Sequence, residues 1–557
     1  MTAPLAFTAL IPAALFGAVA VAAARRRDGR GPGVARLGSL ASAAGVVVAL
    51  AVAAVTALHG TSTSPTLGTA DLGLSVRLDA LSVTMLAMIA VLAAVVVRYS
   101  RTYLDGDPRR DAFLGRLAAT IAAVEVMVVS GNLVLLVAAW VTTSLTLHGL
   151  LVFHGDRPRA VVAARKKFVL ARIGDVLLVG AAVALYDATG TGDLGTILDQ
   201  ASQLPPAWAI GGISLAAVLL AAAAALKSAQ FPTHGWLVEV METPTPVSAL
   251  LHAGILNAGP FLAIRTAYVL DSSRTATTAL LVVGGTTAVV ASIVLLTQPS
   301  VKVALAYSSA AHMGFMLMIC GMGLYPAALL HLVAHSFYKA HAFLSSGSVI
   351  DDQRASGVAL PRRLGRPGRV LASTGIALAL YLPLALLLGV DLVGEPVLLA
   401  VGAILVLGTT QLVAPALDST GTAAGVVRAV VLAAGVTVSF FTLEAGAHHL
   451  LQGAVPELVP RDGIQLALVV AVLLAFATVV ALQIIEPARP SGPRRRALAV
   501  HLRNGLYANA VYDRVIGALR VRPQAAPLTA PGAGRPGAGR PGAGTAPTDQ
   551  PLEASWN

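Results

Sequence analysis

Charged residues are scarce in this chain of 557 residues, at 12% of the total, where a soluble domain has roughly 25%. Hydrophobic residues make up 56%, and the mean hydropathy is +0.78. This composition excludes a soluble α/β enzyme. Apolar runs of about 20 residues, the length that crosses a bilayer as a helix, recur along the chain. We therefore expect an all-α integral membrane protein.

Cysteine is almost absent, since Cys320 is the only one. A single cysteine excludes a disulfide framework, a CxxC metal site and iron–sulfur ligation. The GxGxxG and Walker A patterns are missing as well, so nothing indicates binding of a nucleotide or a flavin. The sequence thus shows no redox centre and no site of ATP hydrolysis, and we expect no cofactor.

The apolar runs predict about fifteen membrane-spanning helices. They lie near residues 5–24, 37–58, 80–97, 113–130, 133–153, 168–186, 207–227, 246–269, 277–297, 302–320, 326–349, 370–388, 396–415, 427–443 and 464–485. The first run has no basic residue before it and Arg25–Arg27 after it. This is the reverse of a secretory signal, so we expect this helix to be retained.

The basic residues that give the net charge of +12 are concentrated in some loops and nearly absent from others. Four loops carry five Lys or Arg each, near residues 25–36, 98–116, 157–167 and 354–369. The loops near 59–79, 187–206, 270–276, 389–395 and 444–463 carry one or none. Basic loops stay in the cytoplasm, which predicts an outside N-terminus and a cytoplasmic C-terminus. The basic charge is therefore a topology signal, and we expect no nucleic-acid partner.

Three regions follow from these patterns: a polytopic membrane domain over residues 1–490 and two cytoplasmic segments after it. Residues 494–520 have helical apolar periodicity and a basic face, which predicts an amphipathic helix at the membrane surface or against a partner. Residues 521–557 contain the repeat PGAGRPGAGRPGAG (531–544). A Pro/Gly-rich segment cannot bury a core, so we expect this tail to be disordered.

The stretch from Lys227 to Arg265 is the most informative part of the chain. It places a lysine and a histidine among apolar residues and interrupts them with prolines at 232, 244 and 246. A charge at bilayer depth costs about 2.5–3.5 kcal/mol on insertion scales. Backbone groups freed by proline are tolerated there only where protein or a water-filled cavity satisfies them. The stretch therefore indicates a polar pathway through a helical membrane protein.

Two motifs in this stretch carry a resemblance, K-S-A-Q-F-P-x-H-x-W-L and M-E-x-P-T-P-V-S-A-L-x-H-A. They resemble the antiporter-like subunits, which include the large proton-channel subunits of respiratory complex I and of Mrp cation/proton antiporters. The variant found here most resembles the DabB membrane subunits of bacterial inorganic-carbon uptake systems. The resemblance runs from about Arg77 to Ile350 and returns weakly at Asn504–Asp513. It implies an antiporter-like fold with broken helices and inverted repeats.

Lys227 matches the central proton-relay lysine of these subunits, and His252 matches a motif histidine. Burial disfavours the charged form of an amine, so a buried lysine can carry a proton near neutrality. The alternatives are a lysine that extends to the membrane interface and a histidine satisfied within the core.

His331, His335 and Lys339 are spaced i, i+4 and i+8, which places them on one helix face over roughly 12 Å. Three titratable groups on one stripe suit a proton wire, and the pattern also matches the corresponding helix of complex I's most distal antiporter-like subunit. Polar contacts between helices and a zinc site are the alternatives. No nearby Cys, Asp or Glu completes a zinc shell.

Other candidates have weaker support. Lys302, in SVKVALAYSS, matches a family motif at a helix start, and an interfacial anchor is the competing reading. Asp175 matches a family acidic residue and lies one turn from Arg172, with which it can pair. His312 and His341 have only their position in their favour.

The chain departs from the family at two places. Complex I and Mrp subunits carry a glutamate directly after the tryptophan of the fifth helix, whereas Val141 follows Trp140 here. Lys227 therefore needs another partner, and Glu125 and Asp175 are the candidates. The second departure is the helix near 370–388, which has Tyr381 and Pro383 but lacks the lysine or glutamate of the family.

The resemblance implies an ion-translocating subunit, for protons or sodium, that couples the ion-motive force to uptake of CO2 or bicarbonate. It implies a zinc-containing cytoplasmic partner of the DabA type, similar to carbonic anhydrase, which performs the chemistry, so this chain would not itself be an enzyme. A proton-pumping subunit of a complex I-like or Mrp-like assembly is the main alternative. A third reading is a non-conducting membrane scaffold that docks a soluble enzyme.

Overall fold

Helices make up nearly all of the described chain, because a polypeptide in a bilayer must satisfy its backbone polar groups internally. The computed structural model describes residues 3–25, 33–69, 71–204, 211–348, 367–388, 396–418, 422–458, 462–485 and 492–515. The predicted tail at 521–557 and most of the basic loop at 354–369 lie outside these ranges.

The first half of the chain contains ten helices and two short hairpins within the described residues. The helices are η1 (Ala3–Leu10), α1 (Ile11–Arg25), α2 (Gly33–His59), α3 (Ala80–Tyr103), α4 (Arg110–Val128), α5 (Leu133–Leu151), α6 (Pro158–Thr189), α7 (Leu194–Ser202), α8 (Gly212–Lys227) and α9 (Gly235–Glu239). Strand β1 (Ser62–Thr63) pairs antiparallel with β4 (Arg77–Leu78), and β2 (Leu67–Thr69) pairs antiparallel with β3 (Leu72–Leu74).

The second half begins with short segments and continues with long helices. These are η2 (Val240–Glu242), α10 (Thr245–Ala253), η3 (Ile255–Asn257), α11 (Ala258–Arg265), α12 (Ala267–Asp271), α13 (Arg274–Leu295), α14 (Val301–Gly321), α15 (Tyr325–Leu344), α17 (Pro367–Leu387), α18 (Pro396–Leu417), α19 (Ala423–Leu451), α20 (Gly463–Ile485), α21 (Pro493–Arg503), η5 (Gly505–Tyr507) and α22 (Ala508–Val515).

Each of the fifteen apolar ranges coincides with a helix or, near 246–269, with the consecutive segments α10, η3 and α11. Within the described residues, eleven helices are long and apolar enough to cross a membrane. The other four ranges correspond to α4, α8, α15 and α17. The all-α membrane class is therefore confirmed, and the number of fifteen spans stays a prediction.

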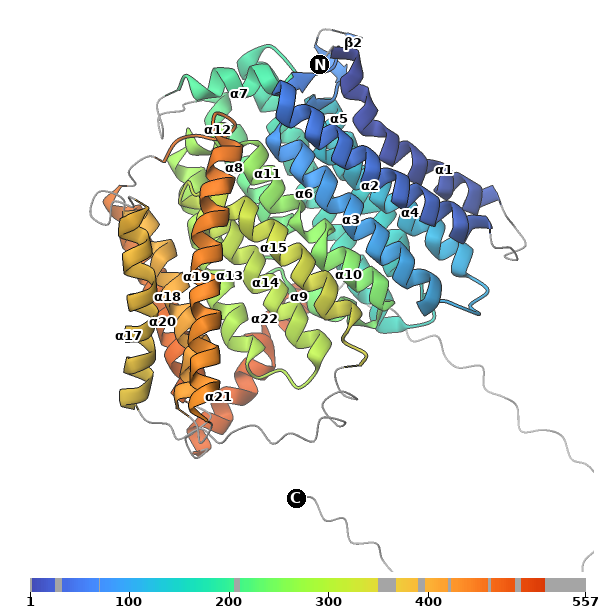
Figure 1. The fold of residues 1–557 in the computed structure, drawn as a ribbon. Coiled ribbons are helices and arrows are strands. Elements are labelled where there is room, and N and C mark those ends of the chain that lie inside the picture. Colours follow the sequence, from blue (N-terminus) through green and yellow to red (C-terminus); the bar gives the residue numbers. More distant parts are fainter. Residues whose placement is uncertain are drawn as a thin grey trace, which may run out of the picture. The chain divides into compact units, whose positions relative to one another are not determined.

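The helices pack as neighbours along the sequence and across it. Figure 1 shows α1 to α4 at one edge, α17 to α20 at the other, and α8 to α15 between them. Small residues permit a close approach between α13 and α14. A Cβ atom on Gly284 would lie 2.5 Å from the carbonyl oxygen of Gly314, and one on Gly314 would lie 2.6 Å from that of Gly284. Such small-residue contacts let membrane helices pack backbone to backbone.

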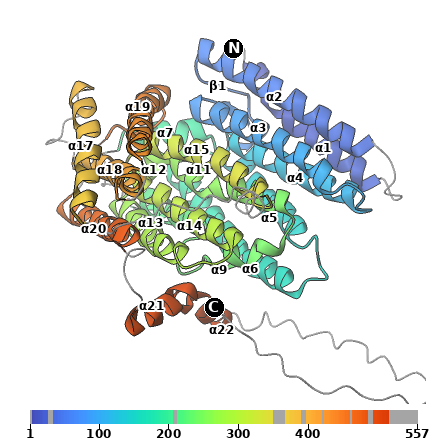
Figure 2. The ribbon, with the colours of Figure 1, turned by 60° about the horizontal axis from the view of Figure 1, so that its bottom comes forward.

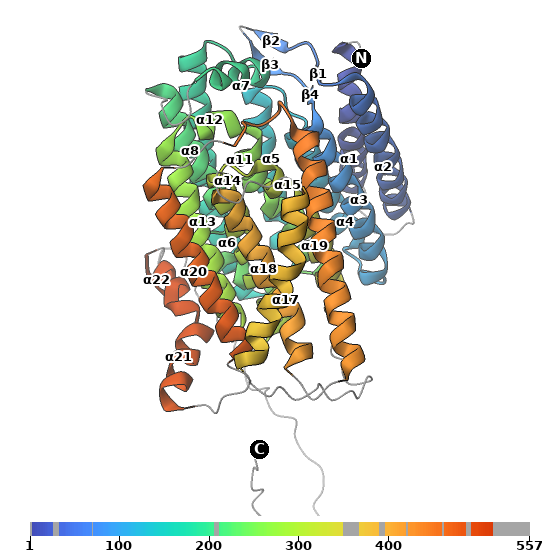
Figure 3. The same ribbon diagram turned by 60° about the vertical axis from the view of Figure 1, so that its left-hand side comes forward.

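Loops with few basic residues gather at one end of the helices. The amide of Asn132 donates to the carbonyl of Asp71 at 2.7 Å, and Asn132 also bridges to Asp193. Tyr268 donates to the carbonyl of Val455 at 3.1 Å. Figure 3 shows the hairpins, α7 and α12 at this end, with α21 at the opposite end. The loops expected on one side of the membrane thus share one end of the bundle.

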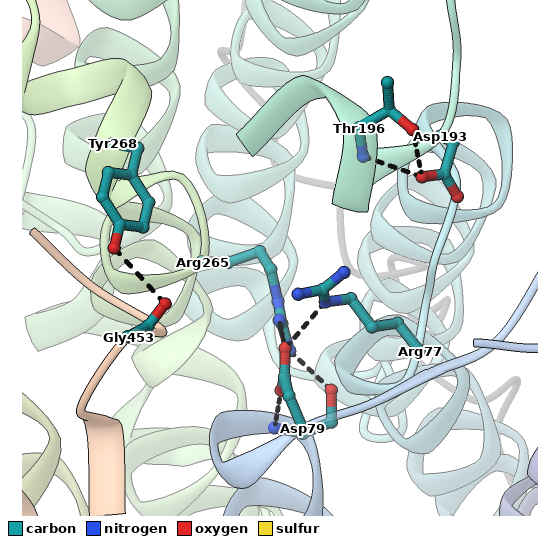
Figure 4. A network of polar contacts seen from close by, with 8 residues as sticks. Arg77, Asp79, Asp193, Thr196, Arg265, Tyr268 and Gly453 are labelled. Atoms are coloured by element: carbon teal, nitrogen blue, oxygen red, sulfur yellow. Dashed lines mark hydrogen bonds and ion pairs between the residues drawn. The ribbon is translucent and has the colours of Figure 1, made fainter. Parts of the chain in front are cut away.

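A buried ion cluster closes this end (Figure 4). Asp79 caps α3 by accepting from the Ser82 amide at 2.9 Å. Its carboxylate lies 2.5 Å from Arg265, the last residue of α11, and 2.9 Å from Arg77. Burial alone would raise the pKa of Asp79, but the charge of Arg265, its hydrogen bond and the charge of Arg77 hold that pKa well below its usual range.

The C-terminal segment differs from the single helix predicted over 494–520. It forms α21 and α22, separated by a turn in which Gly505, Leu506 and Tyr507 have φ between 54° and 59°. Left-handed backbone cannot continue an α-helix, so the segment bends there. Residues after 515 lie outside the described part of the chain.

Replacing Asp79 with Asn should lower the thermal unfolding midpoint of the detergent-solubilised protein. Asn keeps the helix cap but leaves Arg265 buried without its partner, a loss typically worth about 3–5 kcal/mol. Because the pKa of Asp79 is lowered in the folded state, the stabilisation is fully present above pH about 4 and is lost as the pH falls further.

The control is Asp107→Asn, which removes a more exposed carboxylate that lies 3.6 Å from Arg109. It should shift the midpoint little, since exposed pairs contribute about 0–1 kcal/mol. Equal midpoints for the two variants would contradict a stabilising role for the Asp79 cluster.

Candidate functional site

The segment from α8 to α11 is broken three times, and the prolines at 232, 244 and 246 lie at the first two breaks. Helix α8 ends at Lys227, the short α9 and η2 follow, and α10 begins at Thr245 with Pro246 in its first turn. Between α10 and α11 the chain is interrupted at Gly254. There the Asn257 amide donates to the carbonyl of Ala253 at 2.8 Å and to Ser336 of α15 at 2.7 Å. A side chain of the broken segment thus satisfies a backbone carbonyl that the break frees, and the same amide ties the break to α15.

The two ends of this segment are tied to other helices. Lys302, half-buried at the start of α14, donates to the Thr245 hydroxyl at 3.2 Å. Arg265 binds Asp79 at the other end. The structure therefore places Lys302 at the first turn of α10, where it positions the broken helix.

Lys227 lies buried where α5 and α8 meet. Its ammonium donates to the Ser144 hydroxyl at 2.5 Å and to the Trp140 carbonyl at 3.4 Å. The same nitrogen lies 4.2 Å from the centre of the Trp140 ring. A hydroxyl, a carbonyl and an aromatic face are favourable partners for a desolvated cation.

The two carboxylates expected beside Lys227 are arranged differently. Asp175 forms an ion pair with Arg172 at 2.6 Å, and its charge also acts on Lys227. Glu125 is fully buried in α4, and neither of its oxygens has a hydrogen-bond partner among the described residues. Neither carboxylate contacts the Lys227 ammonium directly. Sequence reasoning missed Ser144, because nothing in the sequence distinguishes one serine in an apolar helix.

The second cluster forms where α10, α14 and α15 meet. His312 and His331 lie 2.9 Å apart through their ring nitrogens, and the His335 ring centre is 5.0 Å from that of His312. Lys339 is fully buried and donates to the Leu305 carbonyl at 3.1 Å. The predicted stripe on α15 is therefore inward-facing, and it gains His312 from α14.

His252 approaches this cluster from α10. It is fully buried and its ring stacks on Phe343 at 4.3 Å. Neither ring nitrogen has a hydrogen-bond partner among the residues that the structure describes. The neighbouring histidine on α15, His341, is exposed and lies outside the cluster. Within the described residues, no three or more His, Cys, Asp or Glu side chains are arranged to hold a metal ion.

The described residues of α17 to α20 carry little buried charge. Tyr381 of α17 stacks on Phe441 of α19 at 5.5 Å, and no charged side chain of α17 joins them. Glu444 lies one turn further along α19, and one of its carboxylate oxygens is buried without a hydrogen-bond partner. Glu444 was not among the residues selected from the sequence.

A third cluster of polar residues joins the C-terminal segment to α6 and α9. Lys166 of α6 lies 2.7 Å from Glu239 of α9 and forms an ion pair with Asp513 of α22. Asn509 donates to Glu239 at 2.5 Å and packs so closely on Gly235 that a Cβ atom there would collide with it. Helix α22 packs against α9, and Figure 2 shows these two helices near each other. In the sequence, Lys166 is one of several basic residues in the loop expected near 157–167, and nothing there indicates this contact.

Two family profiles match the chain. One, described as "NADH:quinone oxidoreductase/Mrp antiporter, TM", matches residues 130–389, and one described as "NADH-Ubiquinone oxidoreductase (complex I), chain 5 N-terminus" matches residues 65–114.

Three curated relatives illustrate the similarity. The chain is 38% identical over 466 residues to a "Probable inorganic carbon transporter subunit DabB2" of Halothiobacillus neapolitanus, with 81% of each chain covered. It is 44% identical over 292 residues to a "Probable inorganic carbon transporter subunit DabB" of Hydrogenovibrio crunogenus, covering 52% of this chain and 55% of the relative. It is 35% identical over 286 residues to NADH-quinone oxidoreductase subunit L of Escherichia coli, covering 51% and 46%.

Solved structures share the fold. A chain of the Mrp complex from Dietzia sp. has a TM-score of 0.56 at 23% identity, over 95% of this chain and 58% of that one. A chain of respiratory complex I from Thermus thermophilus has a TM-score of 0.52 at 18% identity, over 90% and 99%. These neighbours confirm the antiporter-like fold.

Replacing Lys166 with Gln should loosen α22 from α9, because Glu239 and Asp513 lose the cation between them. Loosened helices unfold locally more often, so trypsin should cut after Arg503 and Arg514 several times faster than in the unchanged protein. The exposed neighbour Arg165, replaced by Gln, is the control for charge and should leave the cleavage rate unchanged. Equal rates for both variants would show that Lys166 does not anchor the segment.

Proposed function

Because the chain belongs to the family of DabB inorganic carbon transporter subunits, we propose that it is the ion-translocating membrane subunit of an inorganic-carbon uptake system. It couples the ion-motive force to uptake of CO2 or bicarbonate. One observation carries the proposal: two buried clusters of titratable side chains, around Lys227 and around His335, within the apolar helices. Ionisable groups are costly at this depth and mark ion pathways.

The composition of the clusters favours protons as the coupling ion. Lys227, Lys339 and the histidines are nitrogen bases, which take up and release protons at pH values that cells maintain. The short His312–His331 contact is a hydrogen bond along which a proton can pass. His252 lies between α10 and α15 and supplies a further base. Sodium coupling is the alternative, and replacement of sodium in the medium tests it.

The energetics allow useful coupling. One charge that moves through 100 mV supplies about 2.3 kcal/mol, and about 1.4 kcal/mol corresponds to a tenfold concentration ratio. A single ion can therefore support roughly a fortyfold excess of bicarbonate per 100 mV.

The chemistry belongs, in this proposal, to a zinc-containing cytoplasmic partner of the DabA type that resembles carbonic anhydrase. This chain itself is a transporter subunit and no enzyme. It resides in the plasma membrane, with its N-terminus outside and its C-terminus in the cytoplasm. The basic loops support this orientation, as does the gathering of Arg-poor loops at one end.

A second candidate is a proton-pumping subunit of a complex I-like or Mrp-like assembly. The similarity to NADH-quinone oxidoreductase subunit L over half of the chain and the His331–His335–Lys339 stripe favour it. Val141 and the lack of a charged residue over residues 370–387 of α17 count against it, because related pumping subunits have charged residues at both places. The protein encoded beside this gene discriminates: a soluble protein with zinc ligands supports carbon uptake, and several small hydrophobic subunits support the alternative.

Expression of this chain with its genomic neighbour should restore growth in air to a bacterium that lacks carbonic anhydrase. Lys227→Met, at matched membrane levels, should abolish the rescue, because it removes the amine that carries the ion. His335→Ala should do the same, whereas His341→Ala, which alters an exposed histidine of the same helix, should grow like the unchanged protein. Growth rate in air, with added CO2 as the permissive condition, is the measurement.

Rescue by Lys227→Met would still support a role in carbon uptake but would contradict ion flow through this lysine. It would favour a non-conducting membrane scaffold. Failure of the unchanged protein, with both subunits shown to be folded and associated, would favour the complex I-like or Mrp-like assembly.

A further inference from the structure

A second lysine converges on the residue that holds Lys227. Lys167, near the start of α6, has a buried side chain and donates to the Ser144 carbonyl at 3.1 Å. Lys227 donates to the Ser144 hydroxyl at 2.5 Å. One residue of α5 therefore fixes two amines from two different helices. The charges of Lys167 and Lys227 also act on each other.

The charges around Ser144 do not balance when both lysines are protonated. The groups that face the pair are His148 on α5 and Arg172 and Asp175 on α6. Asp175, the one carboxylate among them, is 2.6 Å from Arg172 and its charge also acts on both lysines, so one negative charge faces three cations. No carboxylate of the described residues forms an ion pair with Lys167 or Lys227. Two unpaired ammonium groups side by side in a buried site repel strongly.

We propose that Lys167 and Lys227 share one excess proton and form a two-lysine relay, in place of the lysine–carboxylate pair that Val141 removes. In each transfer an N–H bond of the Lys227 ammonium breaks and an N–H bond forms on the neutral Lys167 amine. The positive charge moves with the proton, and nothing is oxidised or reduced. This inference rests on the proposed ion translocation and assigns a further residue to it.

The two lysines of the relay belong to different helices. Lys167 lies nine residues into α6, about 14 Å from the start of that helix at 1.5 Å per residue, and α6 begins at the basic loop near 157–167. Lys227 ends α8 and leads into the broken segment. Lys167 therefore belongs to the helix that begins with the basic residues, and Lys227 to the helix that leads into the broken segment.

The test measures proton uptake into liposomes that contain the full chain with its genomic partner, under an imposed potassium diffusion potential, with an internal pH-sensitive dye. Both Lys167→Met and Lys167→Arg should lower the flux by about tenfold or more, as expected for a lost proton-transfer group. Arginine keeps the charge and the hydrogen bond but does not release a proton. Arg165→Met removes an exposed charge from the same basic run and should leave the flux unchanged.

The pH dependence of the remaining flux should also shift, and the two Lys167 variants should shift it in opposite directions. Loss of a cation in Lys167→Met favours protonation of Lys227, so the profile should move to higher pH. A permanent cation in Lys167→Arg should move it to lower pH. A merely structural role would not produce opposite shifts.

Flux at the unchanged level in Lys167→Arg would show that Lys167 is a fixed cationic donor to Ser144, and it would overturn the relay. Unchanged flux in Lys167→Met would overturn it as well. Lys227→Met is measured in parallel to separate the two proposals. Unchanged flux in Lys227→Met would contradict ion translocation through this lysine, whereas loss there with active Lys167 variants would remove only the relay.

Discussion

The structure depends on one constraint: each polar group that lies at bilayer depth must find its partner within the protein. The break between α10 and α11 illustrates it. Asn257 satisfies the carbonyl of Ala253 and reaches α15 through Ser336. Arg265 ties the far end of the segment to Asp79, and Lys302 ties the near end through Thr245. The break can persist because these contacts hold both of its sides, and His252 is thereby placed against α15.

The constraint is only partly met at the titratable clusters, through which the proposed ion pathway runs. Both oxygens of Glu125 and both ring nitrogens of His252 and His335 lack hydrogen-bond partners among the described residues. Buried polar groups without partners are costly, so a chain that retains several of them in its membrane helices gains something else from them. Uptake and release of an ion is the gain that such groups provide.

Because Val141 replaces the glutamate expected after Trp140, other groups contact the Lys227 ammonium in this chain. A related lysine has a carboxylate beside it, which stabilises the ammonium by charge. Here the Ser144 hydroxyl and the Trp140 ring hold the nitrogen without neutralising it, and Lys167 adds a second amine.

Much of the architecture could be predicted, because apolar runs of membrane-spanning length are local features. All fifteen ranges contain helices, and the i, i+4, i+8 spacing placed His331, His335 and Lys339 on one buried face. Contacts between distant residues could not be predicted. Ser144 lies 83 positions from Lys227, and Asn509 lies 343 positions from Lys166. Nor did the periodicity of 494–520 reveal the left-handed turn at Leu506 and Tyr507, because side-chain pattern does not encode it.

The most direct test of the account is the accumulation ratio of labelled inorganic carbon in cells that express this chain with its partner, as a function of imposed membrane potential. Coupled ion flow predicts that the ratio rises steeply with potential, toward about fortyfold per 100 mV for one ion per bicarbonate. It also predicts that the dependence disappears in Lys227→Met. A ratio that is independent of the imposed potential in the unchanged protein would contradict the central claim.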